Sequence, residues 1–194
     1  MAYKKLNLSH KGFTNLPNTI TSYEIEELNC SQNNIISLNN LPPALKKLEC
    51  CQNKITALDN LPIALEFLNC SRNELTSLDN LPKTLKKLVC NTNHLTVLDN
   101  LPLALEVLDC SDNKIYCLDN LPRTLNGLNC SNNQLTELRN LPLNMYIYCI
   151  IDPLDYNLTN ITDKHITKTI INNKKSSFAI GYEKSNDKSI CIIQ

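Results

Sequence analysis

The sequence predicts an α/β-type repeat solenoid that is mostly β, with a parallel sheet on its concave face and short 3₁₀ or extended segments on its convex side. The main observation is a block of 20 residues that recurs five times between residues 41 and 140 without an insertion or deletion. A fixed period of this length is typical of solenoids, in which each unit buries its apolar face against its neighbours. The second observation is that every block carries the hydrophobic alternation of one short strand.

The centre of each block predicts that strand. In the block around residue 68, alternation directs Leu68 and Cys70 inward and Phe67 and Asn69 outward. Six cysteines share the second inward position: Cys30, Cys50, Cys70, Cys90, Cys110 and Cys130. Because a free cysteine packs as a small hydrophobe, we expect buried thiols there and neither a disulfide framework nor a metal site.

The remainder of the block predicts a turn and an extended return path. An asparagine recurs at positions 53, 73, 93, 113 and 133, where a buried amide can satisfy backbone groups of the turn that leaves the strand. A Leu-Pro pair opens every block, and proline fixes φ and has no N–H. We therefore expect an extended segment after each pair.

The segment 65–75 fits the pattern L-x-x-L-x-L-x-x-N-x-L, with cysteine in place of the third leucine. With its Leu-Pro pairs, the chain resembles the short (20-residue) Leu-Pro-containing leucine-rich repeat family, as in bacterial type III effectors and giant-virus leucine-rich repeat proteins. The resemblance covers roughly residues 1–150 and implies a protein-binding scaffold. Some of those effectors also end in a ubiquitin-ligase domain. Too few residues follow position 150 for such a domain, so the resemblance implies the scaffold and not the ligase.

The repeats predict three segments along the chain. Residues 1–20 form an N-terminal capping repeat, and 21–160 form the solenoid with a degenerate last unit. In that last unit Met145, Tyr148 and Ile150 are expected to take the inward positions. Residues 161–194 lose the period, and both a closing hairpin and a loose tail remain open for them.

Composition narrows the function. The formal net charge is zero, which does not favour a nucleic-acid partner. We find no long apolar run and no N-terminal secretory pattern, and so expect a cytoplasmic protein with reduced thiols. The sequence shows no phosphate-binding loop, nucleophile motif or metal-ligand spacing. We therefore predict a monomer that is not an enzyme, with no catalytic residues, no metal and no cofactor.

The outward strand positions are the candidate binding site for another protein. They are Lys47, Glu49, Phe67, Asn69, Lys87, Val89, Val107, Asp109 and Asn129. Most are polar, but Phe67, Val89 and Val107 are apolar and lie in consecutive repeats. Exposed apolar side chains in one cluster favour a partner-binding patch, whereas scattered surface apolarity is the alternative.

The final four residues, Cys191-Ile192-Ile193-Gln194, match a C-a-a-X prenylation box. The terminal glutamine favours a farnesyl group, and nearby lysines supply the second signal that a single lipid chain needs. This motif predicts lipidation of Cys191 and peripheral membrane association. The alternative is an apolar strand that closes the C-terminal cap.

Together these features predict a protein-binding leucine-rich repeat scaffold or adaptor, acting as a membrane-tethered viral or bacterial effector in the cytosol of a eukaryotic host. Two alternatives stay open. One is the remnant of a ligase-type effector enzyme, and the other is a purely structural repeat protein.

Overall fold

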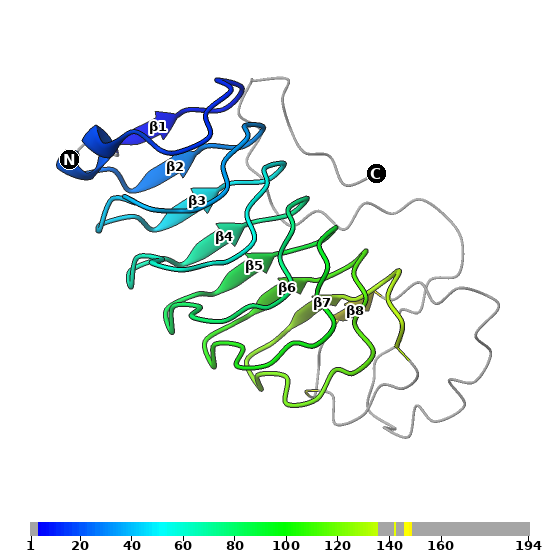
Figure 1. Ribbon diagram of the computed structural model, residues 1–194. Helices are drawn as coiled ribbons and strands as arrows, with labels where there is room; N and C mark the ends of the chain where they lie inside the picture. The colour runs from blue at the N-terminus through cyan, green and yellow to red at the C-terminus, as the bar shows by residue number, and fades with distance from the viewer. Residues whose placement is uncertain (1–3, 136–141, 143–145, 149–194) are drawn as a thin grey trace.

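Eight short strands stack in chain order into one parallel sheet (Figure 1). The structure, a computed structural model, describes residues 4–135, 142 and 146–148. The strands are β1 (Lys5–Asn7), β2 (Glu27–Asn29), β3 (Lys47–Glu49), β4 (Phe67–Asn69), β5 (Lys87–Val89), β6 (Val107–Asp109), β7 (Gly127–Asn129) and β8 (Tyr146–Tyr148). The predicted solenoid with a parallel sheet is therefore confirmed.

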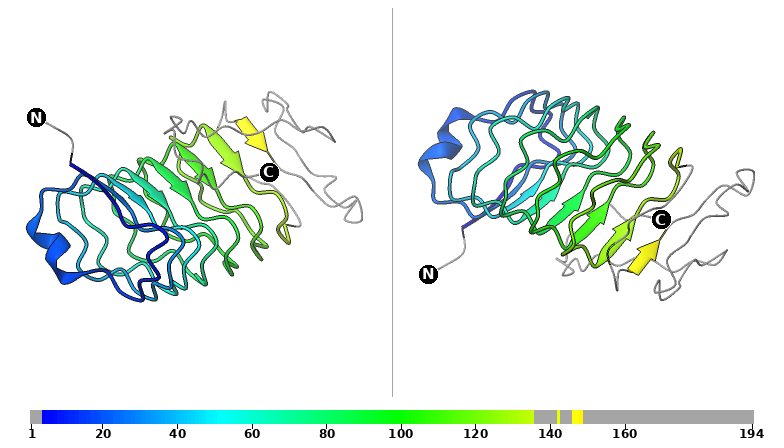
Figure 2. Two further views of the ribbon diagram at one scale, coloured as in Figure 1. Left: turned by 90° about the horizontal axis from the view of Figure 1, so that it is seen from above. Right: turned by 90° about the horizontal axis from the view of Figure 1, so that it is seen from below.

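Each coil of the solenoid holds one strand and returns through extended segments and turns. Figure 2 shows the strands gathered along one side of the coil and the loops stacked on the others. The prediction of an extended segment directly after each Leu-Pro pair is wrong for the described repeats from residue 41 onward, because a turn follows the proline there. In the first of these repeats the Leu45 N–H closes the turn by donating to the Pro42 carbonyl at 3.2 Å. A 3₁₀ helix, η1 (Asn18–Ser22), occurs in the first unit. No helix among the described residues has the length and apolarity needed to cross a membrane.

The register keeps one leucine column along the sheet. Paired residues of neighbouring strands are 20 positions apart except at the two ends of the sheet. Leu48 pairs with Leu68 in the middle of the sheet, whereas Leu6 pairs with Leu28 at the first step. At the last step Ile147 pairs with Leu128, and Tyr148 pairs with Asn129. The register therefore shifts by one residue at this step, and Ile147 continues the leucine column where the constant period had placed Tyr148. Met145 and Ile150 lie outside the described residues.

The cysteine column is buried inside the coil, as predicted. Its six members are free thiols with at most 1% of their surface exposed: Cys30, Cys50, Cys70, Cys90, Cys110 and Cys130. The Cys50 Sγ donates a weak hydrogen bond to the Asn69 carbonyl of the next repeat at 3.3 Å. Burial raises the pKa of the Cys30 and Cys70 thiols to about 12. These thiols are therefore protonated packing groups, since the reactive form is the thiolate.

The asparagine column ties neighbouring coils together. The Asn73 Nδ2 donates to the Cys70 carbonyl of its own coil at 3.0 Å and to the Cys50 carbonyl of the previous coil at 3.1 Å. The Asn73 Oδ1 accepts from the Ile55 N–H at 3.0 Å. The same pattern recurs at positions 53, 93, 113 and 133. The expectation that these amides satisfy the turn backbone is confirmed.

We expect Asn73→Ala to lower the free energy of unfolding by roughly 3 kcal/mol, because it leaves buried backbone donors and acceptors in two coils without partners. Urea unfolding followed by circular dichroism measures the change. Asn126→Ala is the control, since Asn126 is exposed, and it should change stability by less than about 0.5 kcal/mol. Equal effects of the two substitutions would contradict this account of the asparagine column.

A candidate protein-binding face on the parallel sheet

The outward side of the sheet, which we call the strand face, brings all nine predicted binding residues together. The first residue of each strand forms one column, with Lys47, Phe67, Lys87 and Val107 in successive repeats. The third residue forms a second column, which contains Glu49, Asn69, Val89, Asp109 and Asn129. Both columns lie on β3 to β7, which are neighbouring strands of one sheet (Figure 1).

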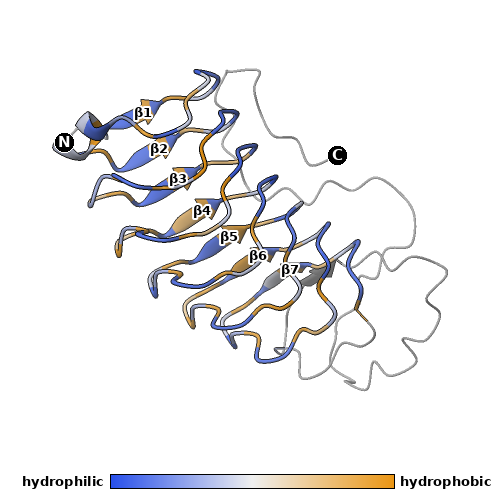
Figure 3. Cartoon of the chain, viewed as in Figure 1, coloured by the Kyte–Doolittle hydropathy of each residue, from blue (hydrophilic) through white to orange (hydrophobic). Residues whose placement is uncertain are grey.

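The first column is half-exposed and mixes apolar and cationic side chains. The Lys47 ammonium lies 5.3 Å from the centroid of the Phe67 ring and 2.8 Å from the Glu49 carboxylate. Lys87 follows Phe67 in the register, and Val107 follows Lys87. In Figure 3 the hydrophobic colour dominates β4, whereas β3 is mostly hydrophilic. The column therefore offers an aromatic ring between two cations.

The second column is not the exposed surface that the sequence predicted. Asn69, Val89, Asp109 and Asn129 each have 4% or less of their surface exposed, so the expectation that they are accessible to a partner is wrong. Glu49 is different, because its longer side chain remains 22% exposed beside Lys47. The residues of the first column are thus the more accessible part of the strand face.

Short side chains explain the burial of the second column. The Asn69 Oδ1 accepts hydrogen bonds from the N–H and the hydroxyl of Ser71, at 3.1 and 2.7 Å, so the side chain folds back onto its own turn. Asn129 makes the same pair of contacts with Ser131. Strands about 4.8 Å apart then leave little open space between stacked small residues. The signal in the sequence for this burial is a serine two positions after each such asparagine, which alternation alone does not reveal.

Asp109 occupies the same position as these asparagines but carries an acidic group. Its Oδ1 accepts from the N–H and the hydroxyl of Ser111, at 3.1 and 2.8 Å. Its Oδ2 is buried and makes no hydrogen bond of ordinary geometry, although the Asn129 side chain lies near enough to favour the charged form. Burial nevertheless raises the pKa of the Asp109 carboxyl above its usual value.

The other predicted sites lie elsewhere or are not described. Cys191, the predicted lipidation site, lies outside the described residues, so its modification stays a prediction. Within the described part of the chain, no group of three His, Cys, Asp or Glu side chains is placed to hold a metal ion. Three aspartates of the column that precedes the Leu-Pro pairs, Asp59, Asp79 and Asp119, accept side-chain hydrogen bonds, such as the 2.7 Å contact from the Ser77 hydroxyl to Asp79.

We expect Asp109→Asn to raise the melting temperature at pH 7, because asparagine fits this column and removes a buried charge. The folded-state pKa of Asp109 is raised, so ionisation of this carboxyl destabilises the folded protein. This loss of stability is absent well below the usual Asp pKa of about 3.9 and grows as the pH rises towards the folded-state value. The advantage of the variant should therefore shrink as the pH is lowered to 3. Thermal unfolding at several pH values measures it, with the exposed Asp99→Asn as the control. If Asp109→Asn lowers the melting temperature at pH 7, the buried Asp109 carboxylate does not destabilise the protein.

No protein-family model matches the sequence, and no curated protein matches it either. Solved structures do match. A Shigella effector leucine-rich repeat domain shares 31% identity with a TM-score of 0.68, over 75% of this chain and 68% of that domain. YopM, a leucine-rich effector protein from Yersinia pestis, shares 31% identity with a TM-score of 0.66, over 75% of this chain and 42% of YopM.

A third similar structure is the functional domain of InlJ from Listeria monocytogenes, which includes a cysteine ladder. It shares 28% identity with a TM-score of 0.64, over 80% of this chain and 38% of that protein. This chain therefore spans well under half the length of YopM and InlJ. The 20-residue coils, the buried cysteine and asparagine columns and the 31% identity to the Shigella domain establish that the chain belongs to the short-repeat leucine-rich repeat family of the bacterial effectors.

Proposed function

We propose that this protein is a non-enzymatic scaffold that binds another protein through the first column of the strand face, with Lys47, Phe67, Lys87 and Val107 as the contact residues. The observation that carries the proposal is their arrangement. These half-exposed side chains lie in register on four adjacent strands, β3 to β6. The buried asparagine column below holds the strands in place before any partner arrives.

The chemistry of the column supports a protein partner. Aromatic and cationic side chains that lose water at an interface contribute a large share of binding energy. Phe67 offers such an anchor, and Lys87 beside it offers a charge for an acidic group on the partner. A rigid sheet also lowers the entropy that binding must overcome.

The relatives support a setting for this function. The Shigella domain comes from an effector, and YopM is named as an effector protein. We therefore propose that this chain acts in the cytosol of a eukaryotic host. The similar Shigella structure is a leucine-rich repeat domain, which favours a binding scaffold over the remnant of a ligase-type enzyme.

We expect Phe67→Asp to reduce the capture of a protein partner from eukaryotic cytosol by at least about tenfold, because it removes the aromatic anchor and places a charge in the contact column. Quantitative mass spectrometry of the captured proteins identifies the partner, and titration calorimetry with that purified partner measures the affinity. Tyr116→Asp is the matched control, since Tyr116 is 55% exposed and lies outside the sheet.

Both variants should keep the circular dichroism and melting temperature of the wild type. If Phe67→Asp binds the purified partner as tightly as the wild type, the strand face is not the binding site. If the wild type captures nothing above the level of an unrelated repeat protein, the purely structural alternative is favoured.

Prenylation of Cys191 remains a proposal that rests on the sequence motif. We expect the full chain, expressed in eukaryotic cells, to gain the mass of a farnesyl group at Cys191 and to partition partly with membranes. Cys191→Ser should remain in the soluble fraction. Intact mass spectrometry checks the modification, and an unmodified wild-type protein in those cells would exclude it.

A further inference from the structure

The lysines of the first column differ in whether an acid of the chain neutralises them. Lys5, Lys47 and Lys87 begin strands β1, β3 and β5. The Lys5 ammonium lies 3.0 Å from the carboxylate of Glu27, its register partner on the next strand. The Lys47 ammonium lies 2.8 Å from the carboxylate of Glu49, two positions later on its own strand. An acid in either position can therefore neutralise a lysine of this column.

Both of these positions are apolar around Lys87. Val107 is its register partner on the next strand, and Val89 lies two positions later on its own strand. Phe67 is its register partner on the preceding strand. Lys87 makes no ion pair in the part of the chain that the structure describes. Lys87 is thus a half-exposed cation whose neighbours in the sheet are apolar.

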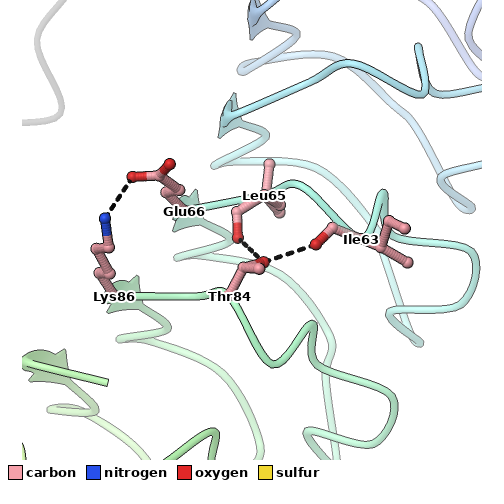
Figure 4. Close-up of polar contacts among 5 residues, drawn as sticks. All are labelled: Ile63, Leu65, Glu66, Thr84 and Lys86. Carbon is pink, nitrogen blue, oxygen red and sulfur yellow. Dashed lines mark hydrogen bonds and ion pairs between the residues drawn. The ribbon is translucent and has the colours of Figure 1, made fainter. Parts of the chain in front are cut away.

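Two acids on the strands around Lys87 are bound to other groups. Glu66 lies 2.8 Å from Lys86, the residue before Lys87 (Figure 4). Asp109 accepts hydrogen bonds from the N–H and the hydroxyl of Ser111, at 3.1 and 2.8 Å, and makes no ion pair with Lys87. The charge of Lys87 is therefore open to an acidic group of a partner.

The apolar neighbours determine what kind of partner Lys87 accepts. A partner that covers Phe67 and Val107 with apolar groups also removes water from the Lys87 ammonium between them. A cation that loses water without gaining an opposite charge costs free energy. A carboxylate placed over Lys87 offsets that cost, and the ion pair is stronger away from water. The best partner surface is therefore apolar with one acid at its centre.

A carboxylate fits this position better than a phosphate does. A phosphate group carries about −1.5 to −2 charges at pH 7, and proteins usually bind it with clusters of arginine. Lys87 supplies one positive charge, which matches a single carboxylate. An anionic membrane or a nucleic acid would also meet the Glu49 carboxylate, which remains 22% exposed on the same face, and like charges repel. An acidic side chain of a protein is thus the favoured ligand.

We propose that the strand face binds a protein segment in which an Asp or Glu side chain lies between two apolar ones. Lys87 binds the acid, and Phe67 and Val107 contact the apolar side chains on either side of it. The order follows the register, because these three residues lie on the consecutive strands β4, β5 and β6. This inference rests on the proposed strand-face function and adds the chemical class of the partner segment, with Lys87 as the residue that determines specificity.

A phage-displayed library of random dodecapeptides, selected against the full chain, tests the proposal. We expect the wild type to enrich peptides with an Asp or Glu flanked on both sides by apolar residues. Lys87→Glu should enrich Lys or Arg at the central position instead, because the charge that it presents is reversed. Lys83→Glu is the matched control, since Lys83 is an exposed lysine of the same repeat outside the sheet. It should enrich the same peptides as the wild type.

A double-mutant cycle with the tightest selected peptide isolates the ion pair. Fluorescence anisotropy measures the affinity of the labelled peptide, which should fall as salt is added. Lys87→Gln should lower the affinity at least about tenfold, and so should replacing the acid of the peptide by its amide. The two changes together should cost no more than either one alone, because both remove the same interaction.

A third variant supplies the missing acid within the chain. Val89→Glu places a carboxylate two positions after Lys87, as Glu49 lies after Lys47. We expect it to weaken binding of the acidic peptide at least about fivefold more than Val89→Gln does, since glutamine has the same shape without the charge. Circular dichroism of both variants checks that they fold, and Lys87→Gln tests the same pair without a change at this buried position.

The proposal is overturned if no peptide is enriched above the level of an unrelated repeat protein, or if the enriched peptides lack an acid. The response of the enriched peptides to two variants separates this proposal from the strand-face function. If Phe67→Asp loses them and Lys87→Gln retains them, only the assignment of Lys87 fails. If both variants retain them, the strand-face function fails as well. If Lys87→Gln loses them and Phe67→Asp retains them, the assigned apolar contact is wrong and the proposal is overturned.

Discussion

The structure depends on one hydrogen-bonding constraint, which is the buried amide of the repeat asparagine. A three-residue strand cannot satisfy the backbone of the turn that follows it, and water cannot reach that turn inside the coil. The Asn73 side chain donates to backbone carbonyls in two coils and accepts a hydrogen bond from the Ile55 N–H. Because each amide joins one coil to the one before it, stacking and turn formation become a single event. The period of 20 residues follows from that requirement, since an insertion would move the asparagine away from its partners.

The sequence predicted the parts of the fold that repetition and alternation control. Leu68, Cys70 and Asn73 lie where the repeat placed them, because a residue that recurs every 20 positions must have the same environment in each coil. The end of the sheet was harder to predict. Tyr148 was assigned from a constant period, but the last step is shorter by one residue and the register shifted with it. No neighbouring repeat in the sequence signalled that change.

The candidate site was predicted less well, for a physical reason. Alternation tells which face of the sheet a residue joins, but exposure also depends on the length of the side chain and the bonds it makes. Val89 and Asp109 join the strand face and are still buried, whereas Glu49 reaches solvent from the same column. The exposed apolar side chains of Ile63 and Leu103 were not predicted, because a consensus averages neighbouring repeats. Ile63 and Lys83 share one consensus position, and the hydrogen bond from the Thr84 hydroxyl to the Ile63 carbonyl joins two coils, which a single repeat unit does not contain.

That threonine contact divides the solenoid into pairs of coils. The pairing determines which duplications and deletions of repeats preserve the contact. Thr84 and Lys86 reach back to the coil of Ile63 and Glu66, and Thr124 reaches back in the same way to Leu103. Loss of residues 81–100 alone would set two acidic coils side by side and remove the threonine between them. Loss of 81–120 would bring Thr124 against Ile63 and restore the contact. Duplication and deletion in steps of 40 residues are therefore the changes that this solenoid accommodates most easily.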